Sequence, residues 1–185
     1  NPETLFSIFT PYPKIDPELV NRKDFQFYDS KPLGMIKLNF LAIFYWLMTK
    51  FGLQIQPWSC LKSIKDATVL LDIGGITFAD GRLVFLPYNI LTILPALIFS
   101  VPVIKLSQAA GSFKNPIIRV LARYFLPKCD FTFARGEQTL SFLKQLGLSE
   151  DKVTLAMDAT FVYEPSFCLT NENDTATQQI VEQLV

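Results

Sequence analysis

Four segments between residues 66 and 161 decide the fold: DATVLLDIGGITFADG (66–81), SVPVIKLSQAAG (100–111), FTFARGEQT (131–139) and VTLAMDATF (153–161). Each contains a short apolar run typical of a strand, and each run ends in small or polar residues. Helical segments lie between them. This alternation of strands and helices predicts a parallel sheet with right-handed crossovers. The sequence therefore predicts an α/β fold with a Rossmann-like parallel sheet flanked by helices.

Proline and glycine positions set the expected boundaries. Asn115-Pro116 is a helix start, and Gly147 is a natural helix end because glycine tolerates the left-handed conformation there. Turns are expected at Gly74-Gly75 and over 108–112. The expected strands are 5–10, 24–28, 68–73, 101–107, 131–134 and 153–157. The expected helices are 16–22, 35–51, 58–64, 88–100 with a kink at Pro95, 115–127 and 137–146.

The composition excludes several classes of function. Lys+Arg and Asp+Glu both number 17 among 185 residues, so no basic excess indicates nucleic acid as a partner. The chain has no histidine, which removes a histidine base or metal ligand. Its 3 cysteines have no metal-binding spacing, so no metal is expected and a reducing compartment is favoured.

Two apolar segments, 36–47 and 90–106, are candidates for membrane contact. Lysines and prolines interrupt both before they reach the roughly 20 apolar residues of a spanning helix. We expect the first to be a buried or partner-facing helix and the second a helix followed by a strand. Peripheral contact with a membrane surface remains an alternative. Without a secretory signal, the expected location is cytoplasmic.

The polar residues gather where ligands bind in open α/β sheets, beyond the carboxyl ends of the strands. Gly74-Gly75 follow the first central strand, and Asp80 lies on the loop beyond them. They could bind an anion or a hydroxyl-bearing ligand, or simply form turns. Gln108 and Gly111 follow the next strand; they could recognise sugar hydroxyls or phosphate, or satisfy loop backbone.

A third group follows the strand at 131–134. Arg135 could bind a carboxylate or phosphate with its fork of donors, or pair with Asp158 or Glu137. Thr139 lies in the first turn of the following helix, where hydroxyls are favoured. Asp158 follows the last strand, where it could instead cap the next segment. Catalytic residues are not identified by the sequence.

These motifs resemble the polysaccharide pyruvyltransferase family. The order is Gly-Gly-x-x-x-x-Asp, Pro-Val-x-x-x-x-Gln-x-x-Gly, Ala-Arg-x-x-x-Thr-Leu-x-x-Leu-x-x-Leu-Gly and Asp-Ala-x-Phe. The matching positions are Gly74, Gly75, Asp80, Pro102, Val103, Gln108, Gly111, Ala134, Arg135, Thr139, Leu140, Leu143, Leu146, Gly147, Asp158, Ala159 and Phe161. The resemblance is clear over 66–163.

The resemblance implies one half of a GT-B-type two-domain fold. It implies transfer of a pyruvyl group from phosphoenolpyruvate, a donor substrate rather than a cofactor, to a sugar of a cell-surface polysaccharide. The family's first strand and Gly-rich loop are not found here, Gly136 replaces an acidic residue, and the donor-binding Arg and His residues belong to a C-terminal half. We therefore expect an incomplete N-terminal, acceptor-side domain at 1–165, and a linker and helix start at 166–185.

Two other functions remain open. A GT-B glycosyltransferase using a nucleotide-sugar would share the sheet and the cleft. A non-catalytic interaction domain would dock through the aromatic helix at Phe40, Phe44, Tyr45 and Trp46, although these residues also suit a core.

Overall fold

The computed structural model describes residues 4–17 and 23–158. Its central sheet is formed by β3 (Leu70–Asp72), β4 (Ile76–Ala79), β5 (Val103–Gly111), β6 (Phe131–Arg135) and β7 (Val153–Ala156). The helices that follow these strands are α4 (Leu86–Leu91), α5 (Leu94–Ile98), α6 (Pro116–Phe125) and α7 (Glu137–Leu146), with short 3-10 turns at Leu83–Phe85 and Leu126–Lys128. The helix expected at 16–22 lies only partly within the described residues, and the linker and helix expected at 166–185 lie outside them.

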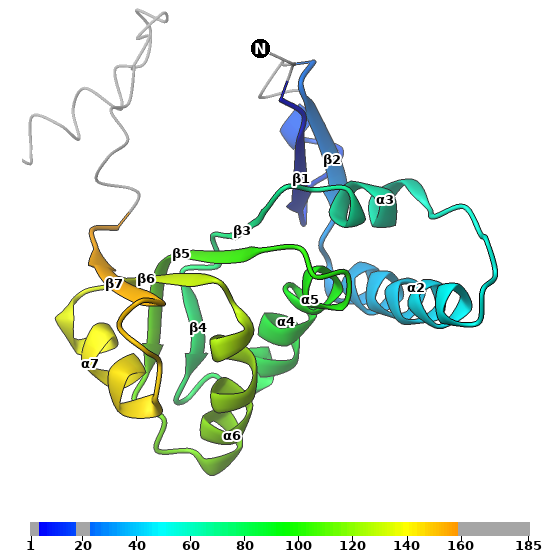
Figure 1. Ribbon diagram of the computed structural model, residues 1–185. Coiled ribbons are helices and arrows are strands. Elements are labelled where there is room, and N and C mark those ends of the chain that lie inside the picture. Colours follow the sequence, from blue (N-terminus) through cyan, green and yellow to red (C-terminus); the bar gives the residue numbers. More distant parts are fainter. Residues whose placement is uncertain (1–3, 18–22, 159–185) are drawn as a thin grey trace, which may run out of the picture.

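All strand pairs in the central sheet are parallel, in the order β3-β5-β6-β7, with β4 also paired to β5. Figure 1 shows α4, α6 and α7 on one side of this sheet. The prediction of an α/β fold with a Rossmann-like parallel sheet flanked by helices is therefore confirmed. Because the strands are parallel, their carboxyl ends lie along one edge.

Local sequence explains the helix boundaries beside this edge. The Asn115 side chain accepts hydrogen bonds from the N–H groups of Ile117 and Ile118, at 2.9 and 3.3 Å, and so caps α6. Leu143 and Leu146 bury one face of α7 against the sheet. Gly147, with φ of 108°, then ends α7 in the left-handed conformation that glycine favours.

Two expectations about strand ends are wrong. The predicted turn at Gly74-Gly75 is only an interruption, because β4 continues along β5 after it. The predicted turn over 108–112 is largely strand, since β5 extends to Gly111. A bulge explains the second error: the β5–β6 register shifts between Lys105 and Gln108, and Ser107 takes φ of 50° there.

The N-terminal part forms a separate layer. β1 (Phe6–Thr10) and β2 (Phe25–Asp29) make a two-stranded parallel sheet, followed by α2 (Pro32–Lys50) and α3 (Ser59–Lys65). In Figure 1 this layer lies at the end of the domain away from β7 and α7. α2 and α5 share a second core with the amino end of β5, which includes Leu61, Ile93 and Val103.

Candidate functional site

The row of expected site residues crosses the sheet from β3 to β7. The N–H of Ala109 donates to the carbonyl of Gly75 at 2.7 Å, which joins the first two groups. Gln108 lies opposite Ala134 on β6, and Arg135 lies opposite Ala156 on β7. The side chains behave in two ways along this row: those on β3–β5 are buried in a polar network, and those beyond β6 and β7 line an open pocket.

The buried network is built around an ion pair that the sequence did not reveal. The Lys105 ammonium donates to the Asp72 carboxylate from within the sheet, where Lys105 is 0% and Asp72 8% exposed. The other oxygen of Asp72 accepts the Gly74 N–H at 2.9 Å. The ring of Phe78 lies 5.8 Å from the ammonium. The pair therefore fixes the interruption between β3 and β4.

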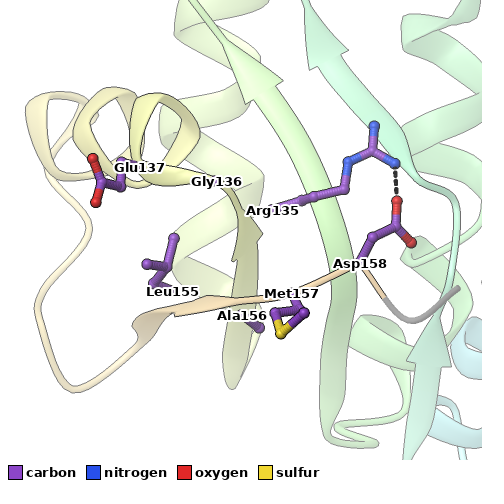
Figure 2. A pocket seen from close by; sticks show the side chains of 7 residues that line it. All are labelled: Arg135, Gly136, Glu137, Leu155, Ala156, Met157 and Asp158. Atoms are coloured by element: carbon purple, nitrogen blue, oxygen red, sulfur yellow. Dashed lines mark hydrogen bonds and ion pairs between the residues drawn. The ribbon is translucent and has the colours of Figure 1, made fainter. Parts of the chain in front are cut away.

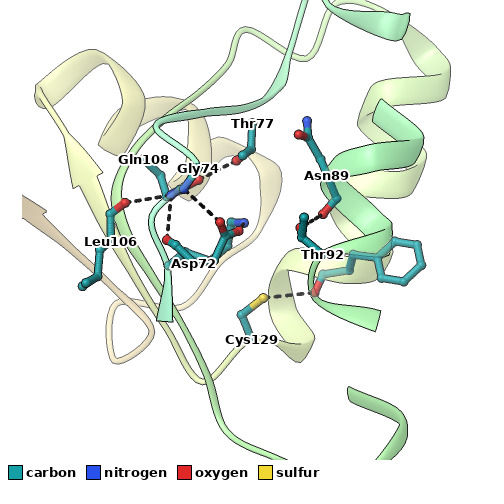
Figure 3. A network of polar contacts seen from close by, with 10 residues as sticks. Asp72, Gly74, Thr77, Asn89, Thr92, Leu106, Gln108 and Cys129 are labelled. Atoms are coloured by element: carbon teal, nitrogen blue, oxygen red, sulfur yellow. Dashed lines mark hydrogen bonds and ion pairs between the residues drawn. The ribbon is translucent and has the colours of Figure 1, made fainter. Parts of the chain in front are cut away.

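Gln108 completes this network rather than facing solvent. It is 0% exposed; its carbonyl oxygen accepts the Thr77 hydroxyl at 2.6 Å, and its amide donates to the carbonyls of Asp72 and Leu106 at 3.1 and 2.7 Å (Figure 3). The bulge at Ser107 turns both Lys105 and Gln108 toward the covered face. In this geometry Gln108 holds three strand segments together.

The glycines permit close approach of chain segments. A Cβ on Gly74 would lie 2.9 Å from an Asp72 carboxylate oxygen. A Cβ on Gly111 would lie 2.3 Å from the ring of Phe142, so α7 packs directly on the end of β5 only because this residue is glycine. Thr139 is 7% exposed in the first turn of α7 and does not line the pocket described below.

Asp80 follows β4 and holds the loop that leads into α6. Its carboxylate accepts the Ser112 hydroxyl at 2.8 Å and the N–H groups of Lys114 and Asn115 at 2.8 and 3.1 Å. Burial tends to raise the pKa of Asp80, but these hydrogen bonds and the charge of Lys114 outweigh it, so the pKa lies below its ordinary value. This residue joins loop segments and is separate from the Arg135–Asp158 group.

A pocket of about 590 Å³ lies beyond β6 and β7. It is lined by Arg135, Gly136, Glu137, Leu155, Ala156, Met157 and Asp158. Figure 2 shows the side chains of Arg135 and Asp158 pointing toward one another, where they form an ion pair. The Arg135 side chain is still 35% exposed, so the ion pair does not enclose it.

The pocket combines apolar and charged surface. Leu155 and Met157 are 47% and 72% exposed, which is high for residues of their size and places apolar atoms on its wall. Arg135 is the one cation among its lining residues and pairs with Asp158, whereas the Glu137 side chain points away from this pair in Figure 2. α7 starts at this pocket without a side-chain cap, because Gly136 stands at the capping position. Its first N–H groups have no partner within the helix.

The sequence indicated Arg135 and Asp158, and the structure joins them. The sequence analysis missed Leu155 and Met157, although their spacing of two residues at the end of the expected strand 153–157 was a signal for a shared side. The pairing of Lys105 with Asp72 had no signal, because the two residues are 33 positions apart. Among the described residues, no group of three or more His, Cys, Asp and Glu side chains could hold a metal ion.

Comparison with known proteins gives one match. The family model for polysaccharide pyruvyl transferase matches residues 1–181 of the 185-residue chain. The match therefore covers the central sheet, the pocket and the N-terminal layer together. Comparison with curated proteins and with solved structures gave no match.

Proposed function

Because the chain belongs to the polysaccharide pyruvyl transferase family, a family of transferases that act on polysaccharides, we propose that it forms the acceptor side of such an enzyme. In this proposal a sugar of a cell-surface polysaccharide receives a pyruvyl group from phosphoenolpyruvate. The pocket beyond β6 and β7 holds the acceptor sugar. The single observation that carries the proposal is the meeting of Arg135 and Asp158 at a pocket with apolar walls.

The lining of this pocket suits a sugar. Carboxylates accept hydrogen bonds from hydroxyl groups, and arginine donates them, so the paired Asp158 and Arg135 match a ring bearing several hydroxyls. Apolar atoms of Leu155 and Met157 suit the C–H face of such a ring. A volume of about 590 Å³ is within the range of small-molecule sites.

The proposed reaction conserves atoms as follows. A proton is added to the methylene carbon of phosphoenolpyruvate, which becomes a methyl group, and a sugar hydroxyl oxygen bonds to C2 while losing its proton. A second hydroxyl of the same sugar then displaces phosphate from C2 and gives its proton to the departing phosphate. The product is a cyclic ketal that bears the pyruvate carboxylate, and inorganic phosphate leaves.

Arg135 and the uncapped start of α7 support a place for that carboxylate. Arginine binds carboxylates through two parallel N–H donors, and free N–H groups at a helix start favour negative charge. We assign the remaining contacts with the donor to a second half of the enzyme, since phosphoenolpyruvate carries a phosphate and a carboxylate and the pocket lining offers one cation. The free thiols of Cys60 and Cys129 support a cytoplasmic site for the reaction.

The carboxylates of Glu137 and Asp158 also argue against a nucleotide-sugar as the ligand of this pocket. A pyrophosphate group in this pocket would meet a lining with two carboxylates and one cation, and that cation is already paired with Asp158. A neutral sugar meets no such repulsion. The lining therefore favours a sugar acceptor over a nucleotide-sugar donor at this pocket.

Saturation-transfer NMR on the 185-residue chain tests the proposal. The probes are methyl glycosides of glucose, galactose and mannose and of their N-acetylated forms. We expect transfer to at least one glycoside, a loss of about tenfold or more in affinity for Arg135→Ala, and no phosphate release when phosphoenolpyruvate is added to this chain alone. Lys144→Ala, on the exposed side of α7 where Lys144 pairs with Glu150 at 2.7 Å, is the matched control.

Three outcomes would contradict the proposal. One is the absence of saturation transfer to every glycoside. Another is equal affinity in Arg135→Ala and Lys144→Ala. The third is tighter binding of UDP than of any glycoside, with UDP binding lost in Arg135→Ala, which would favour the glycosyltransferase.

A further inference from the structure

The segment from Ser30 to Lys65, which contains α2 and α3, has a charge unlike the rest of the chain. It carries five lysines and no acidic residue, whereas the remaining residues carry 12 basic and 17 acidic side chains. The lysines are Lys31, Lys37, Lys50, Lys62 and Lys65, and all of them are exposed. A chain with zero net charge therefore has a concentrated positive charge on this segment.

The same segment exposes a stripe of large apolar side chains on α2. Leu33, Phe40 and Phe44 are 80%, 71% and 47% exposed, and Phe51, just past the helix end, is 77% exposed. Their spacing of seven, four and seven residues places them on one side of a helix. Moving side chains of this size out of water lowers the free energy, so this stripe is suited to bind an apolar partner.

The opposite side of α2 is fixed to the folded domain. Ala42 is 0% exposed, and Tyr45 packs edge-on against Phe99 with ring centroids 5.9 Å apart. The Asn39 side chain donates to the carbonyl of Leu91 on α4 at 2.9 Å. Tyr45, which the sequence grouped with the docking aromatics, thus belongs to the core.

These contacts decide how α2 could meet a membrane. Of the helices that the structure describes, α2 is the one long and apolar enough to cross a bilayer, with a mean hydropathy of 1.3. A spanning helix would have to give up its contacts with α3, α4 and α5. A helix lying along the surface keeps them and offers only its exposed stripe, about 28 Å long, to lipid.

Both tryptophans of the chain lie in this segment. Trp46 and Trp58 are 40% and 44% exposed, and the Lys50 ammonium lies 5.7 Å from the Trp46 ring. Tryptophan and lysine with exposed apolar neighbours are the composition of helices that lie at the level of lipid headgroups. We propose that the α2–α3 surface, residues 30–65, binds an anionic lipid bilayer with the axis of α2 in the membrane plane.

The charge of residues 30–65 favours lipid over a second copy of the chain as the partner of the exposed stripe. Two copies meeting through this surface would bring the lysines of each segment toward one another, and of these lysines Lys65 has a carboxylate beside it, that of Asp66 at 3.6 Å. An anionic leaflet attracts the same lysines. In Figure 1 α2 and α3 lie at the end of the domain away from β7, whose residues Leu155 and Ala156 line the proposed sugar pocket, so the two sites are separate.

Vesicle sedimentation tests the inference without any glycan, so its outcome is independent of the proposed transferase activity. The probes are phosphatidylcholine vesicles with and without phosphatidylglycerol. We expect binding only to the anionic vesicles, because an anionic leaflet attracts the exposed lysines. Phe40→Glu should weaken binding about tenfold or more. Lys37→Gln combined with Lys50→Gln should weaken it about 25-fold.

Val84→Glu is the matched control, since Val84 is 88% exposed outside this segment and its variant should bind like the unaltered chain. Circular dichroism melting should show that all variants are folded. No sedimentation with either vesicle would overturn the inference, as would an equal loss for Val84→Glu. A dimer in ultracentrifugation that Phe40→Glu dissociates, without vesicle binding, would assign the stripe to a second copy instead.

Discussion

Replacing Lys105 by methionine should destabilise the domain strongly, because it leaves the Asp72 carboxylate without its partner inside the sheet. Methionine has nearly the length of lysine and leaves no large cavity. Removing one member of a buried ion pair costs about 3–5 kcal/mol, since the remaining charge is uncompensated. The full burial of Lys105 and the 8% exposure of Asp72 place this pair in that range. Such a loss is a large part of the 5–15 kcal/mol typical of domains.

The assay is urea denaturation followed by circular dichroism, with a second variant that separates charge from packing. Lys105→Met combined with Asp72→Asn contains no buried charge, and the asparagine oxygen can still accept the Gly74 N–H. We expect this double variant to recover at least half of the lost free energy of unfolding. Lys37→Met, on an exposed lysine of α2, should change it by less than about 0.5 kcal/mol.

The opposite pattern would refute the reasoning. If Lys105→Met lost less than about 1 kcal/mol, the Asp72 charge would not depend on this partner. If the double variant were as unstable as the single one, packing rather than charge would hold β3 to β5.

Three further predictions concern single residues. Asp80→Asn should cost about 1–2 kcal/mol of unfolding free energy at neutral pH, because the amide cannot accept the same three hydrogen bonds. Folding lowers the pKa of Asp80, so this contribution is fully present above the ordinary value of 3.8 and should shrink as the pH falls through the lower folded pKa. Measuring the free energy of unfolding at a series of acidic pH values checks this. Burial raises the pKa of the Cys129 thiol to about 11, so Cys129 should resist thiol reagents at pH about 8 in the folded chain and react after urea unfolding, as peptide mapping of labelled protein would show. Asn115→Ala should cost about 1 kcal/mol in thermal unfolding, because α6 loses its cap, whereas Asn115→Asp keeps an acceptor oxygen and should cost little; an equal loss in both variants would contradict the cap as the cause.

The helices beside the sheet were predictable because their signals are local. α7 has the boundaries expected from its leucine spacing and from Gly147, and α6 begins at the expected Asn115-Pro116. The helix expected over 88–100 divides into α4 and α5, separated near the expected kink at Pro95. Local patterns were enough wherever capping and side-chain spacing decide the structure.

The sheet interior was not predictable in the same way. Gln108 reads as a turn residue in sequence, because nothing local shows the bulge at Ser107 or the hydroxyl of Thr77 that Gln108 meets. Lys105 reads as an interruption of an apolar run, because its partner Asp72 is distant in the chain. The hydrogen-bond partners of polar residues inside a parallel sheet lie on neighbouring strands, and the register of those strands is a property of the whole fold.

The pocket was predictable in part. Arg135 and Asp158 follow consecutive strands of a parallel sheet, so their convergence followed from topology once the strands were recognised. The hypothesis that Arg135 pairs with Asp158 is confirmed, and the same pair leaves the arginine partly exposed at the pocket. Pairing and ligand binding are therefore compatible at this arginine.

Chemical-shift mapping with the isotopically labelled chain tests the central claim most directly. On titration with the methyl glycoside that shows saturation transfer, we predict shift changes concentrated at Arg135, Gly136 and Glu137 and at the end of β7. Changes confined to α2, or to the amino ends of the strands, would contradict a sugar site at the carboxyl edge of this sheet.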